Sequence, residues 1–317
     1  MYIRTTEGLG QAPLQYSLGD TAASSREADR RFKRVAALVT SGLKAAKGAI
    51  PHLPGKGQQE LLGFLVSLLD NFFPSGHGLI DARAQVLRQS QKATVQVNVR
   101  DRDGVLWPFE HRVRLYLNDQ SGFRKSGDHL TGHFSSIRLF SRALHDGTPV
   151  HAGLVALHEM IHMMFVMVRR FEQRFGVETA ARFLSRQPWR LLVLSGFTAY
   201  RERLERHVRD LLRVVPIPIQ AAELATSLVE EAFAAIFEVT VDEAIARSSR
   251  TKTSKRQTTI LVTAGFPPRE FLKYYVLERG FAVTEKQLDS REAQQIFARM
   301  TSDVDSLAAA LRTHLDS

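Results

Sequence analysis

The chain has 317 residues, with 43 Lys and Arg against 33 Asp and Glu, 11 His and no Cys. A hydrophobic share of 44% with 24% charged residues excludes wholesale disorder, and the length fits one large domain or two. The lack of Cys excludes disulfides, thiolate zinc sites and a Cys nucleophile. No run of consecutive apolar residues is long enough to predict a membrane span. The first 30 residues lack the apolar core of a Sec signal peptide, so we expect a cytoplasmic location or export by another route.

The formal net charge of +10 suggests attraction to nucleic acid, anionic lipid or acidic partners. The basic residues are spread along the chain except for one dense run at 247–256, which is typical of a solvated loop. No zinc-finger, RRM or basic-zipper pattern accompanies this run. Nucleic acid is therefore a possible partner but not a favoured one.

The first three regions of the chain follow from changes in periodicity. Residues 1–28 show neither helical nor strand periodicity and are expected to form a flexible leader. Residues 29–92 form an N-terminal helical region, because their apolar residues recur at helical spacing. In region 93–148, apolar and polar residues alternate as in half-buried strands. A small antiparallel sheet is predicted there, with strands at 94–100, 112–118 and 133–140.

The rest of the chain is predicted to be helical. Residues 149–250 form a helical core, in which the helix at 150–175 is apolar on nearly every face and therefore buried. Residues 251–317 form a C-terminal helical region. The predicted fold class is thus α+β and predominantly helical. Further helices are expected at 178–186, 190–213, 219–247, 268–279 and 289–314.

One motif in the apolar helix carries chemistry, namely His158-Glu159-Met160-Ile161-His162, the HExxH pattern. Residues four apart lie on one face of a helix, so the imidazoles of His158 and His162 can bind one metal ion. Glu159 projects beside them and can take a proton from water on that metal. Burying these polar side chains in so apolar a helix is unfavourable unless they find partners. The motif therefore predicts a Zn²⁺ site with Glu159 as general base.

A catalytic zinc needs a third protein ligand besides an open position for water. The extended metzincin motif is absent, because Phe165 and Val168 stand where it requires Gly and His. A Cys ligand is excluded as well, which leaves a carboxylate from a second helix. Two segments offer one, at 229–238 and 195–205. The candidate carboxylates are those of Glu231, Glu230, Glu202 and Glu205.

The first of these segments resembles a stretch of the gluzincin metallopeptidases. Glu231-Ala-Phe-Ala, with Glu238 seven residues on, matches in part the NEGFAxYxE-like stretch of their aminopeptidase branch. The resemblance implies Glu231 as the third zinc ligand and Glu238 as an outer partner or a substrate contact. It covers two short segments, and the 68 residues between His162 and Glu231 exceed the spacing of that branch. The stretch departs from the pattern at Glu230, Ala232 and Phe237.

The same resemblance implies a zincin-like core, with the small antiparallel sheet packed beside the HExxH helix. In such folds a strand just before that helix binds the substrate backbone along its free edge, and residues 133–140 lie in that position. These enzymes often stabilise the oxyanion with a Tyr, His or Arg. Tyr200 is the first candidate here. Others are Tyr274, Tyr275 and His207.

The sequence therefore predicts a zinc metallopeptidase that hydrolyses peptide bonds through metal-activated water. One alternative is a basic helical module for nucleic acid or protein, with a non-catalytic or absent metal site. Its mark would be Lys and Arg residues that converge on one face remote from His158. A second alternative keeps zinc as a structural ion, with four protein ligands and no access for water.

Overall fold

Helices dominate the described part of the chain. The computed structural model describes residues 22–70, 90–100, 106–118, 127–131, 135–140, 144–185, 190–249, 267–278, 281 and 283–317. The α-helices are α1 (Ala22–Ala49), α2 (Lys56–Asp70), α4 (Pro149–Phe175), α5 (Val177–Leu184), α6 (Thr198–Val214), α7 (Ala221–Ser249), α9 (Pro268–Glu278), α10 (Glu285–Leu288) and α11 (Arg291–Leu315). Short 3₁₀ helices are η1 (Ile50–His52), η2 (Arg190–Leu192) and η3 (Ser195–Phe197). The predicted helical predominance is confirmed.

The predicted small antiparallel sheet is wrong. Where side chains are described, Leu139 is the single strand residue, and that part of the molecule is helical. The backbone traces a four-stranded mixed sheet in the order β1-β2-β4-β3, in which β2 and β4 run parallel. The connection from β2 to β4 spans 16 residues, long enough for parallel strands, and it contains β3. The strands are β1 (Ser90–Arg100), β2 (Leu106–Asn118), β3 (Gly127–Thr131) and β4 (Ser135–Phe140).

The order of the strands also corrects the expected substrate strand. The segment 133–140 corresponds to β4, which pairs with β2 on one side and with β3 on the other. Both rows of its backbone groups are therefore occupied, and it has no free edge to which a peptide could add.

Two other boundaries differ from the expectations. α1 begins at Ala22, inside the predicted leader, while residues 1–21 lie outside the described residues. The predicted helix at 190–213 consists of η2, η3 and then α6, which begins at Thr198. Most of the basic run 247–256 lies outside the described residues, because α7 ends at Ser249.

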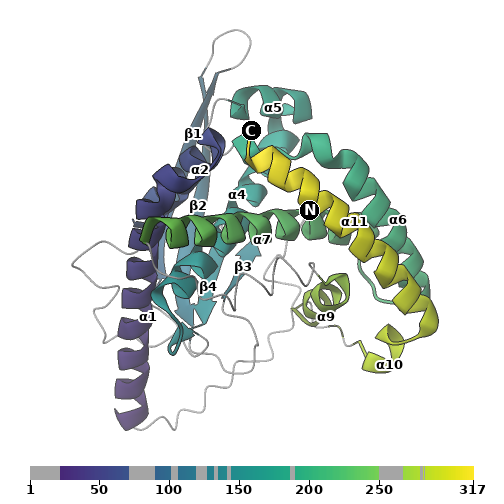
Figure 1. Cartoon of the computed structure of the whole chain (residues 1–317), viewed down its shortest axis with the longest axis horizontal. Helices are drawn as coiled ribbons and strands as arrows, with labels where there is room; N and C mark the ends of the chain where they lie inside the picture. The colour runs from purple at the N-terminus through teal and green to yellow at the C-terminus, as the bar shows by residue number, and fades with distance from the viewer. Residues whose placement is uncertain are drawn as a thin grey trace.

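Helix α4 is the central element (Figure 1). It packs against α1, α2 and α7, and also against β3 and β4. From Ala152 to Val168 every residue except His158 is buried, as the apolar sequence predicts. Its length and composition would allow it to cross a membrane, but 83% of its most apolar 18-residue window is buried inside the protein. This burial is consistent with the expectation of no membrane span.

The ends of α4 have clear local causes. Thr148 caps the first turn, because its hydroxyl accepts a hydrogen bond from the backbone N–H of His151 at 3.1 Å. Pro149 opens the helix at a position where its missing N–H leaves no bond unmade. Gly176 ends it with a φ of 83°, a backbone conformation that favours glycine. The motif residues thus lie in the third and fourth turns of a helix whose start is fixed.

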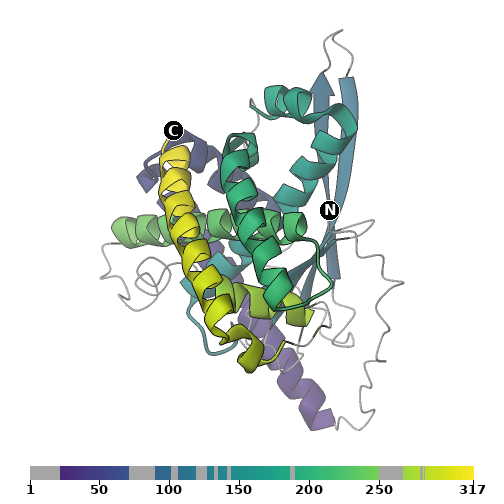
Figure 2. The ribbon, with the colours of Figure 1, turned by 90° about the vertical axis from the view of Figure 1, so that its right-hand side faces the viewer.

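Helix α7 crosses α1 and α4, and α6 and α11 lie side by side against it (Figures 1 and 2). The ring of Phe165 on α4 meets the ring of Phe233 on α7 edge-on, with centroids 5.3 Å apart. Both rings are buried. They lie three residues after His162 and two after Glu231, so this apolar contact holds together the parts of the two helices that carry polar residues.

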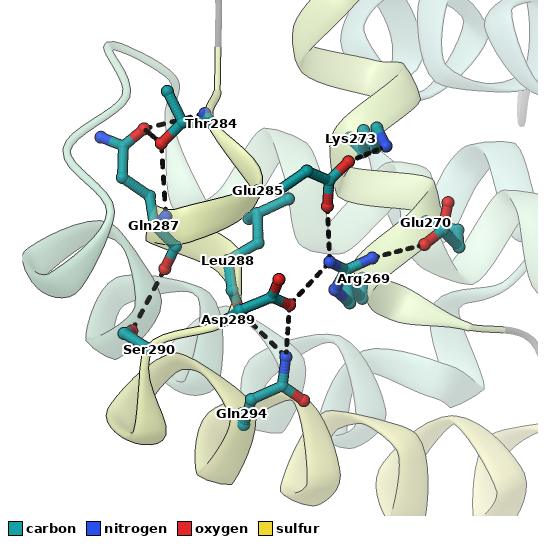
Figure 3. A network of polar contacts seen from close by, with 10 residues as sticks. All are labelled: Arg269, Glu270, Lys273, Thr284, Glu285, Gln287, Leu288, Asp289, Ser290 and Gln294. Carbon is teal, nitrogen blue, oxygen red and sulfur yellow. Dashed lines mark hydrogen bonds and ion pairs between the residues drawn. The ribbon is translucent and has the colours of Figure 1, made fainter.

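The C-terminal helices are tied by charged groups at the surface (Figure 3). The guanidinium of Arg269 on α9 donates to the carboxylates of Glu285 and Asp289, at 2.7 and 2.8 Å. Glu285 also pairs with Lys273 of α9. Hydrogen bonds from Asp289, Glu285 and a neighbouring glutamate raise the pKa of Arg269. These contacts fasten α10 to α9 around the Thr284 capping box.

Two glycines set the crossing of α1 and α4. A Cβ atom on Gly153 would lie 2.7 Å from the carbonyl carbon of Gly42, and one on Gly42 would lie 2.0 Å from the carbonyl oxygen of Pro149. Each of these distances is shorter than a van der Waals contact, and the atoms concerned belong to the backbone. The two helices therefore touch backbone to backbone, five residues before His158.

We expect Gly153→Ala to destabilise the protein by about 1–3 kcal/mol, because the added methyl group must push α1 away from α4. The matched control is Gly48→Ala in α1, an exposed position with no atom within 4 Å of the new Cβ. That change should stabilise the protein by about 0.5–1 kcal/mol, because Ala restricts the unfolded chain more than Gly does. Urea denaturation measures both values. A Gly153→Ala variant as stable as the wild type would contradict the close crossing.

Candidate metal centre

Helices α4 and α7 bring two histidines and a glutamate together. The ligand atoms of His158, His162 and Glu231 all lie within 4.8 Å of one another. The two Nε2 atoms are 3.2 Å apart. The carboxylate of Glu231 faces both rings, with one oxygen 3.3 Å from Nε2 of His158 and the other 3.0 Å from Nε2 of His162. Three donor groups therefore converge on one point between the helices.

These distances fit a zinc ion. Zinc binds imidazole nitrogen and carboxylate oxygen at about 2.0–2.2 Å in tetrahedral geometry, which separates neighbouring ligand atoms by roughly 3.3 Å. The two Nε2 atoms, at 3.2 Å, and Nε2 of His162 with its nearer oxygen of Glu231, at 3.0 Å, are close to that spacing, while Nε2 of His158 lies 3.3 Å from the other oxygen of the same carboxylate. The ring planes of His158 and His162 are inclined by 61°, so the rings are not stacked on each other. The donor set of two imidazoles and one carboxylate is one that zinc commonly accepts.

Glu238 fixes the orientation of the first histidine. Its carboxylate lies 3.1 Å from Nδ1 of His158. A carboxylate can only accept at this distance, so it assigns the ring proton to Nδ1 and leaves the lone pair of Nε2 directed at the cluster. Metal-binding histidines usually have such an outer partner. Glu238 lies two turns after Glu231 on α7, so one face of this helix supplies both carboxylates.

We expect Glu238→Gln to weaken zinc binding by about 10–100-fold, because the amide no longer holds the ring as a charged acceptor. The matched control is Glu243→Gln, the same substitution at a half-buried position of α7. Its zinc affinity should equal that of the wild type. A competitive titration against a chromophoric chelator measures all three proteins. Equal weakening in both variants would show a general effect on α7 and would contradict the assigned role of Glu238.

The cluster is mostly buried but reaches the surface. The exposed fractions of the side chains are 6% for His162, 15% for His158 and 25% for Glu231. Burial alone would lower the pKa of His158, but the carboxylates of Glu231 and Glu238 outweigh it and raise that pKa well above 6.5. Burial would likewise raise the pKa of Glu231, and the two histidines instead hold it well below 4.5. Each group thus favours the charged form of the other, and metal binding must compete with this pairing.

The other predicted site residues are placed as follows. Glu159 is buried, with 8% of its surface exposed, and lies next to His158 in α4. Tyr200 is half-buried on α6, where its ring lies 6.0 Å from that of Phe197 and under the guanidinium of Arg203. Neither Phe197 nor Arg203 belongs to the three-residue cluster. Its role as oxyanion stabiliser stays a prediction.

The alternative third ligands have other partners or positions. Glu230 is buried and pairs with Arg169 of α4. Glu205 pairs with Arg209, one turn further along α6. Glu202 lies exposed on the same helix. Among the described residues, Glu231 is the carboxylate that the structure brings to both histidines.

Arg169 is a residue that the sequence reasoning missed. Burial lowers its pKa to about 10, and its side chain is 22% exposed. It ends the long apolar run of α4, and an arginine in such a place requires a counter-charge. The need for a counter-charge is the signal in the sequence that could have indicated Glu230 as the partner of Arg169. Glu230 precedes Glu231 on α7, but it pairs with a residue that lies seven positions after His162 on α4.

A separate hollow of about 400 Å³ lies along the second half of α7. Its wall includes His52 of η1, Glu243 and Arg247 of α7, and Arg312 of α11. None of the three cluster residues lines it. The chemistry-bearing residues and this hollow therefore belong to different places on α7.

Comparison with known proteins adds no relative. The chain matches no protein-family model, no curated protein and no solved structure. The residues of the site are therefore the observation from which a function can be inferred.

Proposed function

We propose that the protein is a zinc-dependent hydrolase of the metallopeptidase type. The convergence of His158, His162 and Glu231 carries this proposal, because two imidazole nitrogens and a carboxylate, a donor set that zinc commonly accepts, lie within 4.8 Å of one another. Zinc in such a site lowers the pKa of water and polarises a carbonyl oxygen. The gluzincin resemblance of the two helical segments supports peptides or proteins as the substrate class.

The roles of the side chains follow from their positions. His158 and His162 each offer an Nε2 lone pair. The hydrogen bond that Nδ1–H of His158 donates to Glu238 keeps the first ring in the required tautomer. Glu231 supplies a negative charge to the same point. Glu159 is one residue from His158 and three from His162, so it lies beside the same helix face. There its carboxylate accepts a proton as water attacks and later returns it to the leaving amine.

A catalytic site is favoured over a structural one by the number of ligands. Structural zinc sites are closed by four protein ligands, whereas catalytic sites have three and an open position. Among the described residues, three side chains form the group that could hold a metal. Glu238 faces the far nitrogen of His158 and is directed away from this point. The 25% exposure of Glu231 gives the centre contact with solvent.

The proposal is tested by metal content and hydrolysis together. Purified wild-type protein should bind about one zinc per chain and cleave casein, and the activity should be lost with a chelator and return with zinc. His162→Ala should lose both metal and activity, because one imidazole cannot hold the ion alone. The control is His145→Ala, which removes a histidine that pairs with Asp146 outside the cluster. Wild-type protein that takes up no zinc would overturn the proposal.

A further inference from the structure

Helix α1 holds a large share of the charge of the protein. Its 28 residues include seven Lys and Arg and two Asp and Glu. The excess on this one helix is half of the net charge of +10 of the whole chain. This positive charge is concentrated on one helix, and the candidate zinc site on α4 and α7 does not require it.

The two faces of α1 are sharply different. Val35, Val39 and Leu43 are fully or almost fully buried and belong to the core. Where side chains are described, the opposite face is exposed and carries Arg30, Lys33, Arg34, Lys44 and Lys47. In Figure 1, α1 lies at the left edge of the molecule, and its N-terminal end extends beyond the neighbouring helices. We call these five residues the basic face.

Most of the basic face has no ion-pair partner among the described residues. Within the described part of the chain, no ion pair involves Arg30, Lys33, Lys44 or Lys47. Arg34 donates a hydrogen bond to the backbone carbonyl of His145 at 2.8 Å, which is a neutral partner. This contrasts with α6, where Arg203, Arg209 and Arg213 pair with Asp and Glu residues on the same helix or on α11. The field of α1 is therefore directed outward.

The spacing of the charges is specific. Arg30, Lys33 and Arg34 form one group, and Lys44 and Lys47 form a second group that begins ten residues later. The rise of a helix places the two groups about 15 Å apart. Between them the exposed side chains are those of Ala37 and Ser41, which are small. The basic face thus has positive charge at both ends and only small side chains between them.

The chemistry of this face selects among partners. An amphipathic helix binds a membrane by inserting its apolar face, and that face of α1 is already buried in the core. Protein interfaces depend on aromatic and other large anchor residues, and the basic face exposes none among its described side chains. A polyphosphate backbone requires neither, because cations that release its counterions supply the affinity.

We propose that the basic face of α1 binds the phosphodiester backbone of a nucleic acid duplex. The major groove of B-DNA is about 12 Å wide, so two cationic groups about 15 Å apart reach the phosphates on both sides of it. The small residues at 37 and 41 leave room over the groove. Such contacts position the protein without reading sequence. The proposal is independent of the zinc chemistry.

The test uses the full chain and two variants of equal charge. The first carries Arg30→Gln, Lys33→Gln, Lys44→Gln and Lys47→Gln. The matched control carries Arg182→Gln, Lys286→Gln, Arg291→Gln and Arg299→Gln, which remove four exposed and unpaired cations from other helices of the described structure. Binding to a fluorescent 20-base-pair DNA duplex is followed by anisotropy from about 50 to 200 mM salt. A duplex RNA of the same length and vesicles with phosphatidylserine are measured in parallel.

Wild type and control should bind the duplex with the same steep salt dependence. In the α1 variant the slope of log K against log salt should fall by about 3–4, because each lost phosphate contact removes about 0.9. Weaker binding of duplex RNA, whose major groove is deep and narrow, supports the fit of the two cationic groups to the major groove of B-DNA. Equal weakening of both variants, no binding by the wild type, or preference for the vesicles overturns the proposal. Zinc content and casein hydrolysis of the α1 variant should be unchanged, which separates this result from failure of the zinc site.

Discussion

A Glu159→Gln variant is expected to keep about one zinc per chain while hydrolysing casein about 10²–10⁴-fold more slowly than the wild type. The amide has nearly the same size as the carboxylate, so the packing of α4 around this buried position changes little. It cannot accept a proton, and the attack of water then loses its base. Neither histidine is altered, so the metal ligands remain. The measurements are zinc content by atomic absorption and turnover at saturating casein.

The control for this variant is Glu172→Gln. It is the same substitution on the same helix, at a half-buried residue ten positions after His162. Its zinc content and turnover should both equal those of the wild type. If Glu159→Gln is as active as Glu172→Gln, then Glu159 is not the base. If Glu159→Gln loses zinc as well, the residue supports the site and the assigned step is wrong.

Substitution of two neighbouring glutamates on α7 should affect different properties, zinc binding for one and stability for the other. Glu231→Gln is expected to weaken zinc binding by at least about 100-fold, because loss of an outer partner alone weakens binding by about 10–100-fold. Glu230→Gln should leave zinc binding within a few-fold of the wild type. It should instead lower the free energy of unfolding by about 1–3 kcal/mol, because it takes a carboxylate from the buried guanidinium of Arg169.

The two measurements separate binding from folding. Zinc affinity is obtained by competition with a chromophoric chelator, and stability by urea denaturation of the metal-free proteins. Each glutamate serves as the control for the other, since the substitution, the helix and the region of contact with α4 are the same. Tight zinc binding by Glu231→Gln would exclude this residue as the third ligand. Loss of zinc in Glu230→Gln would move the role to Glu230.

The sequence predicts the part of the site that is local. His158, Glu159 and His162 lie within five residues, and helical geometry alone puts the two imidazoles on one face. The position of Glu231 depends on how α7 crosses α4, which no spacing in the sequence determines. The resemblance to the gluzincin stretch is what selects Glu231 among the four candidate glutamates. The structure adds a physical reason, because Glu230 is already paired with Arg169.

The sheet shows where local patterns fail. Alternation of apolar and polar residues predicted three of its strands, because this pattern reflects one buried face. Alternation carries no information on which strand lies beside which. β3 escaped prediction because its five residues, Gly127–Thr131, show no alternation. Without β3, three strands in succession favour an antiparallel sheet, whereas β4 lies between β2 and β3 and runs parallel to β2.

The two helices that supply the donor groups are far apart along the chain, with Glu231 coming 69 positions after His162. An ion held by both binds the folded protein and has no equivalent site in the unfolded chain, so it stabilises the fold in proportion to the logarithm of its free concentration. With zinc as this ion, the lifetime of the protein depends on metal supply. A cell compartment poor in zinc would therefore shorten the survival of the protein as well as reduce its activity.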